Sequence, residues 1–232
     1  MLLRVIDFET TGDTAQDAVC QIGSCDVKPN EDGAIVSAAY QFFTNPNRPM
    51  PPQARAIHHI SDEDLLNARP ISDGFRVLMG FEAGKQPDAF VAHNAEFERM
   101  FFAGGSIPWI CTLKVARRLW PDCPSHSNQC LRYWLGLDLA SDRAMPPHRA
   151  GPDAYVTAWI LSLALKEMPA EDMIRVTKEP SLLPGPIRFG KHKGAGWLEV
   201  PRDYLWWIVS KSDMDADTKF TARYWLEKDG HS

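Results

Sequence analysis

The sequence predicts an α/β fold with a mixed β-sheet, and two observations carry this prediction. Three segments with strand-like composition follow one another at the start of the chain, before any clear helix. Further along, short apolar strands alternate with segments of helical periodicity, and residues 153–168 form the longest apolar-periodic stretch. Successive strands favour antiparallel pairing and alternating strands and helices favour parallel pairing, so the sheet is expected to contain both.

The elements are expected in the following order. The first strand is Leu2–Phe8, and Val19–Val27 and Ile35–Phe43 follow it, separated by the turn-rich KPNEDG. A proline-rich connector comes next, NPNRPMPPQ, and Ser61 three residues before Asp64 resembles a capping box that starts a helix. The remaining helices are expected at 72–82, 95–102, 112–120, 128–136 and 153–168, with strands at 88–94 and 109–111.

Composition excludes several classes of protein. The 232 residues carry a net charge of -5, unlike a protein that coats nucleic acid over a long footprint. The N-terminus reaches acidic residues too early for a signal peptide, and no apolar run approaches the roughly 20 residues of a membrane span. Five cysteines are an odd number, so we expect reduced thiols and a cytoplasmic location.

A domain boundary is expected near EPSLLPGPI, where prolines and a glycine interrupt the pattern. Residues 1–168 form the expected main domain, residues 169–186 a helical linker and residues 187–232 a small C-terminal module. In this module, Trp206 and Trp207 stand at helical spacing with Leu205 and Ile208, which favours packing in its core over stacking on bases.

The stretch VIDFETTG places two carboxylates at the end of the first strand. Because side chains alternate along a strand, Asp7 and Glu9 share one face, while Ile6 and Phe8 share the other. Two adjacent carboxylates repel each other, and a divalent cation between them relieves that repulsion. A solvated strand end is the simpler alternative, but the following TTG offers backbone groups that suit an anionic ligand.

Two further segments contain residues suited to the same site. In AHNAEFERMFF, Glu96 and Glu98 lie about 200° apart on a helix, so only one can face inward. In HRAGPDAYVTAWI, a proline suits the first helical turn and places Asp153 at the start of the helix, with His148 in the preceding loop. A histidine beside carboxylates suits general-base chemistry. Surface glutamates and a loop histidine without a role are the alternatives.

The three segments together resemble the motifs of the DEDDh 3′–5′ exonucleases. DFETTG, HNAEFE and HRAGPDA correspond to the three motifs in order, and IHHIS resembles a further family element. The resemblance covers roughly residues 1–168 and implies an RNase H-like, mixed five-stranded sheet flanked by helices. WICTLKVARRLWPD, PSLL, FGKHKG and YLWWIV resemble one branch of the family, which acts on DNA and carries a short C-terminal extension.

The resemblance implies a role for each matching residue. Asp7, Glu9, Glu98 and Asp153 would hold two Mg²⁺ ions, which Mn²⁺ can replace, and His148 would be the general base. Nucleoside 5′-monophosphates would leave the 3′ end of DNA, either single-stranded or frayed duplex. The substrate-binding residues implied in the same way are Phe8, Thr10, Thr11, Gly12, Ile57, His58, Asn94 and Phe97.

One position departs from the family pattern. Glu98 stands where the family has aspartate, so the carboxylate sits one methylene further out, although Mg²⁺ tolerates little error in its coordination shell. We expect retained activity with an altered preference for Mn²⁺. An RNA-trimming exonuclease and a catalytically weakened nucleic-acid binding or adaptor module remain alternatives. A homodimer is also open, since relatives are often dimers.

Two groups of basic residues are candidates for contact with phosphates. Lys114, Arg117 and Arg118 lie close together on one expected helix, and a second cluster, Arg188 with Lys191–Lys193, lies next to glycines in the C-terminal module. A solvated helix face and an exposed turn are the alternatives.

Overall fold

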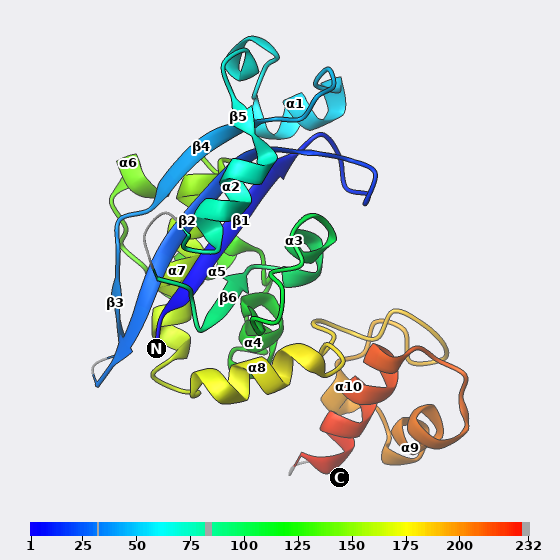
Figure 1. The fold of residues 1–232 in the computed structure, drawn as a ribbon. Coiled ribbons are helices and arrows are strands. Elements are labelled where there is room, and N and C mark those ends of the chain that lie inside the picture. The colour runs from blue at the N-terminus through cyan, green and yellow to red at the C-terminus, as the bar shows by residue number, and fades with distance from the viewer. Residues whose placement is uncertain (32, 82–84, 229–232) are drawn as a thin grey trace.

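A mixed β-sheet forms the centre of the structure, a computed structural model that describes residues 1–31, 33–81 and 85–228 (Figure 1). The strands follow the order β5-β4-β2-β1-β6-β7, and β3 pairs with β2 beside this path. The strand bounds are β1 Leu3–Thr10, β2 Val19–Asn30, β3 Gly33–Val36, β4 Tyr40–Asn45, β5 Arg69–Pro70, β6 Ala89–Ala92 and β7 Trp109–Cys111. The α/β class and the mixed sheet are confirmed, as β1 is antiparallel to β2 and parallel to β6.

The sheet has more strands than the five expected, because the segment Ile35–Phe43 is divided between β3 and β4. The division falls at Ser37, whose backbone N–H donates to the carbonyl oxygen of Asp26 while its hydroxyl accepts from the Asp26 N–H. These bonds end the pairing of β3 with β2 and let the chain turn before β4. The two-residue β5 adds a further strand at the edge.

Ten α-helices accompany the sheet within the described part of the chain. Their bounds are α1 Pro52–His58, α2 Ile71–Leu78, α3 Ala95–Phe101, α4 Thr112–Leu119, α5 Asn128–Trp134, α6 Ser141–Ala144, α7 Ala150–Ala164, α8 Ala170–Lys178, α9 Arg202–Lys211 and α10 Ala216–Glu227. None of the described helices is long and apolar enough to cross a membrane. Two single 3₁₀ turns, η1 Glu63–Leu65 and η2 Trp197–Glu199, complete the set.

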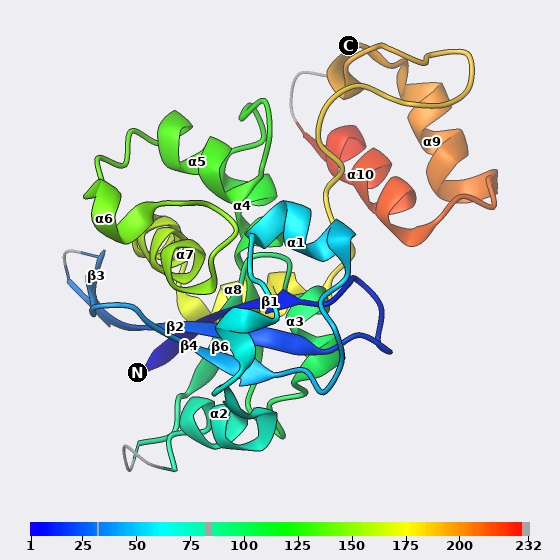
Figure 2. The same cartoon turned by 90° about the horizontal axis from the view of Figure 1, so that it is seen from above.

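The two faces of the sheet are covered by different helices (Figures 1 and 2). Side chains of α4, α5, α7 and α8 form one core, and those of α2 and α3 contribute to a second core on the opposite face. The central helix α7 is buried along most of its length, as its all-round apolar sequence predicts. The expected linker contributes α8, whose Ala170, Met173 and Val176 belong to the first core.

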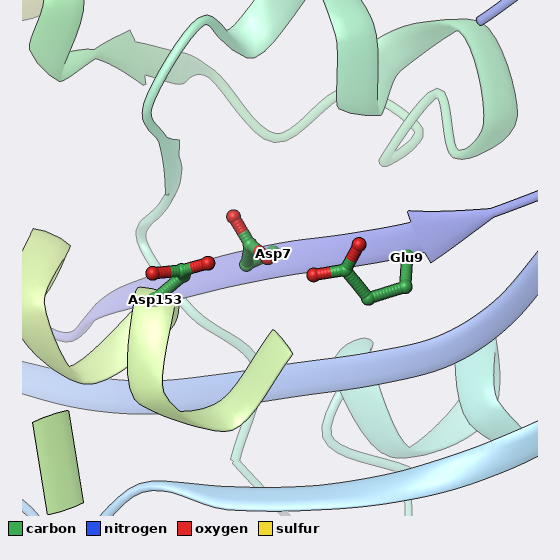
Figure 3. Close-up of side chains that lie close together, drawn as sticks. All are labelled: Asp7, Glu9 and Asp153. Atoms are coloured by element: carbon green, nitrogen blue, oxygen red, sulfur yellow. The ribbon is translucent and has the colours of Figure 1, made fainter. Parts of the chain in front are cut away.

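Alternation along β1 decides where the carboxylates lie. Leu3 and Val5 pack in the core on the α7 side, and Ile6 and Phe8 pack in the opposite core. As predicted, the same alternation places Asp7 and Glu9 on one face of the sheet, and Figure 3 shows both side chains beside Asp153 of α7.

Several elements differ from the sequence expectations. The proline-rich connector contains helix α1, which begins at Pro52, a position where a proline without an N–H fits the first turn. Ser61 and Asp64 do form reciprocal capping bonds, but the turn they start, η1, lasts three residues. Helix α2 ends at Leu78, and the expected end at residue 82 lies outside the described residues, as does residue 32 of the expected turn.

The C-terminal module has a core of its own, built on Ile187, Trp197, Val200, Leu205, Ile208 and Ala222. Both overall views place α10 nearer the sheet and α9 on the outer side. Arg118 on α4 forms an ion pair with Glu179 at 2.7 Å, and its guanidinium lies 4.5 Å from the ring centroid of Phe220 on α10. The prediction that Trp206 and Trp207 pack in this core is wrong, because both residues are exposed and neither belongs to the core.

Candidate active site

The candidate site is a cleft of about 520 Å³ at the end of β1, between α1, α3 and the start of α7. Every residue that the sequence predicts for the site lines it. These residues are Asp7, Phe8, Glu9, Thr10, Thr11, Gly12, Ile57, His58, Asn94, Phe97, Glu98, His148 and Asp153. Segments that are far apart in the sequence therefore converge on one concave surface, as a catalytic site requires.

Three carboxylates form the centre of the cleft. Asp7 and Glu9 on β1 and Asp153 on α7 each have an oxygen within 4.8 Å of the others (Figure 3). Carboxylate oxygens at such spacing are the ligands that Mg²⁺ and Mn²⁺ take in proteins. Glu98 on α3 lines the same cleft, 3% exposed, but lies outside this close group.

Close contact between α7 and β2 brings Asp153 to this position. A Cβ atom on Gly23, which pairs with Asp7, would stand 1.9 Å from the carbonyl oxygen of Ala150, so only glycine allows this approach. Glutamine side chains bond the first helical N–H groups: the Oε1 of Gln21 accepts from Ala150 at 3.1 Å, and that of Gln41 accepts from Gly151 at 3.0 Å. The sequence contains no local signal for these bonds.

The electrostatics of the cleft favour a bound cation. Burial raises the pKa of Asp7 well above its usual range, and the charges of Asp153, Glu9 and Glu98 raise it further. Burial and neighbouring carboxylates raise the pKa of Glu9 and of Glu98 to about 8. Burial also raises the pKa of Asp153. Ionised carboxylates that repel each other in a buried cleft are stabilised by a divalent cation.

A further observation shows that the carboxylate oxygens of the cleft fit such a cation. Oε2 of Glu98 is buried and has no hydrogen-bond partner among the described residues, although a carboxylate oxygen in this position needs a donor or a cation. Arg149 is the basic residue whose charge acts on Glu9, and it lowers the pKa of that carboxyl without offsetting the effect of burial.

His148 stands in the loop before α7 at the mouth of the cleft. Its backbone is left-handed, with φ of 59°, and its N–H donates to Oδ2 of Asp153 at 2.7 Å. The loop thus fixes the histidine and the carboxylate relative to each other. The imidazole is exposed and faces the cleft, where it can meet a substrate or water.

The predicted substrate-binding residues differ in how free their polar groups are. The Nε2 of His58 lies 3.2 Å from the carbonyl oxygen of Thr10, and its Nδ1 accepts from the N–H of Ile60, so this buried ring holds α1 against β1. Thr11 uses its hydroxyl within its own turn, accepting from the N–H of Ala18. Ile57 is 54% exposed and presents an apolar surface to the cleft.

Sequence reasoning missed five lining residues, which are Asp13, Pro51, Gln53, Ala54 and His93. Three of them belong to α1 or its cap, and a proline at the first helical position was the signal for that helix. The basic group on α4 is also engaged differently from the expectation of phosphate contact. Lys114 donates to backbone carbonyls of Thr177 and Glu179, and Arg117 donates to Ser181.

A family model described as RNase_T, Exonuclease, matches residues 5–161. The chain belongs to this exonuclease family. It is 35% identical to Exodeoxyribonuclease 10 of Escherichia coli strain K12, over 97% of this chain and 99% of the relative. The family resemblance and the 3′–5′ exonuclease activity of the DEDDh type that it implies are thereby confirmed.

Two solved structures agree with this assignment. Exonuclease X in complex with 5′ overhanging duplex DNA superposes with a TM-score of 0.63 at 31% identity, covering 75% of this chain and 99% of that chain. The nuclease domain of 3′hExo, a DEDDh family member bound to rAMP, has a TM-score of 0.56 at 14% identity and covers 72% and 92%, which shows the shared RNase H-like fold. A larger relative, the PolC-type DNA polymerase III of Bacillus subtilis strain 168, is 29% identical over 174 residues, which are 70% of this chain and 11% of that protein.

Proposed function

We propose that this exonuclease removes nucleoside 5′-monophosphates from the 3′ ends of DNA, with two divalent cations and with His148 as general base. The observation that carries the proposal is the convergence of Asp7, Glu9 and Asp153 in one cleft beside this histidine. DNA is favoured over RNA because the relative that matches nearly the whole chain is named as an exodeoxyribonuclease. The superposed Exonuclease X structure also contains DNA.

In this proposal each residue has one task. Asp7, Glu9 and Asp153 would hold the cations, with Glu98 completing the set from α3. Bound there, Mg²⁺ or Mn²⁺ would neutralise charge on the scissile phosphate and make water more acidic. His148 accepts a proton from the attacking water at its imidazole nitrogen, while its backbone N–H keeps Oδ2 of Asp153 in place.

The apolar surface of the cleft positions the end of the strand. Ile57 and Phe97 face the cleft from α1 and α3, so the terminal base would lie between an aliphatic side chain and an aromatic ring. Phe97 also contacts Phe101 at a ring-centroid distance of 5.3 Å, which fixes its orientation. Such contacts depend little on the identity of the base, in keeping with stepwise removal along any sequence.

A single assay tests the substrate and the metal together. Single-stranded DNA, duplex DNA and RNA of one sequence, each labelled at the 5′ end, are incubated with Mg²⁺, with Mn²⁺ or with EDTA. We expect shortening from the 3′ end of DNA with either metal and none in EDTA. Faster shortening of RNA than of DNA would refute the substrate proposal, and full activity in EDTA would refute the metal proposal.

The general base is tested by His148→Asn, because asparagine tolerates a left-handed backbone and lacks a basic nitrogen. We expect turnover to fall by about 10²–10⁴-fold with DNA binding retained. His59→Asn is the matched control, since His59 is also exposed and also has φ of 59°. Equal turnover in the two variants would refute the role of His148.

A further inference from the structure

The outer side of α9 carries aromatic residues that the module core does not use. Leu205 and Ile208 of this helix are fully buried in that core. Trp206 and Trp207 are 50% and 41% exposed, although two adjacent tryptophans on an exposed helix face are costly to leave in water. In both views α10 lies between α9 and the sheet, so the side of α9 opposite α10 is turned away from the sheet (Figures 1 and 2).

Ammonium groups lie over two rings of α9, those of Tyr204 and Trp206. Tyr204 stacks on Trp207 with centroids 5.4 Å apart and an interplanar angle of 24°. The Nζ of Lys191 lies 5.2 Å from the Tyr204 centroid, and the Nζ of Lys211 lies 5.2 Å from the Trp206 centroid. We call Lys191, Tyr204, Trp206, Trp207 and Lys211 the α9 surface. It pairs flat π faces with positive charges, whereas a purely apolar docking patch would lack the lysines.

A glycine turn holds one of these lysines in place. Residues 187–195 fold back on themselves, with the N–H of Gly194 donating to Ile187 at 2.7 Å and that of Ile187 donating to Ala195 at 2.9 Å. Gly190 in this turn has φ of 62°, and a Cβ atom there would lie 2.2 Å from the Tyr204 hydroxyl. Glycine therefore lets the turn pack on Tyr204. Lys191 is the next residue in the chain, and its ammonium group lies over the Tyr204 ring.

The charge of the module differs from that of the rest of the chain. Residues 187–232 contain eight Lys and Arg against seven Asp and Glu, whereas the whole chain has 25 against 30. Arg188, Lys191 and Lys193 of the glycine turn are exposed, and none of them forms an ion pair within the described residues. The nearby acid Asp203 accepts from the N–H of Tyr204 at the start of α9.

We propose that the α9 surface is a second binding site for single-stranded DNA, in which bases stack on Trp206 and Trp207 and Lys191 and Lys211 bind phosphates, with Lys193 of the adjacent glycine turn as a further phosphate contact. Stacking platforms flanked by lysines bind single strands without sequence preference, which suits an enzyme that shortens any sequence. The proposal builds on the proposed DNA substrate of the cleft. The site would hold a part of the strand that the cleft does not contact.

The test compares two substrates in the full-length protein. Binding of a long fluorescent single-stranded DNA is measured by anisotropy in EDTA, and nucleotide release is measured with Mg²⁺ on a short oligonucleotide that fills only the cleft. Trp206→Ala with Trp207→Ala is expected to weaken binding of the long strand by about five- to a hundredfold and to leave release from the short one unchanged. Trp134→Ala is the matched control, because Trp134 on α5 is 44% exposed and does not line the cleft.

A second variant does not depend on removing large side chains. Lys191→Gln with Lys193→Gln should make the fall of log affinity with log salt shallower, by about 0.7 in slope for each phosphate that a lysine no longer neutralises. Lys28→Gln, an exposed lysine on β2, should leave the slope unchanged.

The outcomes separate this site from the cleft. Unchanged affinity for the long strand in both variants overturns the α9 site. The α9 site is also overturned if the tryptophan variant alters the sedimentation of the protein but not its affinity for the long strand, because the surface would then be a contact between two copies of the protein. Loss of long-strand affinity in a protein that releases no nucleotides supports the α9 site and contradicts the proposed function of the cleft.

Discussion

His93 offers the most quantitative test of the structure, because both of its ring nitrogens have partners. Nε2 lies 2.8 Å from the carbonyl oxygen of His126, and Nδ1 lies 2.9 Å from the hydroxyl of Thr112. A carbonyl only accepts, so Nε2 carries the proton, and Nδ1 of the neutral ring accepts from the threonine. Burial lowers the pKa of His93 from 6.5 to about 4.

This shift predicts a loss of stability in acid. The folded protein disfavours the protonated ring. The contribution of neutral His93 to the free energy of unfolding is therefore fully present above pH 6.5 and is lost as the pH falls toward 4. The full shift corresponds to about 3 kcal/mol, of which about 2 kcal/mol is lost between about pH 7 and pH 4.5. His58 and His126 add to the loss, because burial lowers the pKa of each of them as well.

Urea unfolding of the wild type and of His93→Gln at both pH values measures the effect. Glutamine keeps an N–H donor for the carbonyl of His126 but does not titrate, so the variant should lose about 2 kcal/mol less than the wild type on acidification. His59→Asn, at an exposed position, should behave as the wild type does. If His93→Gln and the wild type lose the same free energy, the burial of a neutral His93 is refuted.

Three further predictions concern the cleft. Gly23→Ala should destabilise the protein by about 1–3 kcal/mol and reduce turnover, because the new Cβ displaces the start of α7. Gly196→Ala is the control in the same unfolding and activity assays, since its Cβ would meet no atom closer than 3.5 Å. Mg²⁺ should raise the melting temperature more at about pH 8 than at about pH 6, since the raised pKa values of Asp7 and Glu9 make the metal-free cleft less stable as pH rises, and Asp7→Asn should diminish this effect in thermal scans. Glu98→Asp should shift the ratio of Mg²⁺ to Mn²⁺ turnover, and an unchanged rate and ratio would show that the longer side chain has no consequence.

The sequence by itself determined which side chains the candidate site presents. The alternation of β1 assigned Asp7 and Glu9 to one face, and the position of Pro152 assigned Asp153 to the first turn of a helix. These are local rules of strand and helix geometry, which depend on neighbouring residues only. The family motifs added the order in which the three segments combine, and with it the expectation of a single cleft.

The tertiary structure decided what local rules do not contain. The approach of α7 to β2 depends on Gly23 and on two glutamines from different strands, and the sequence does not pair them. Helical spacing alone predicted that Trp206 and Trp207 lie in a core, but Leu205 and Ile208 already fill the side of α9 that meets α10. Periodicity states which residues share a face, whereas burial depends on which face another element covers, and only the assembled chain sets that.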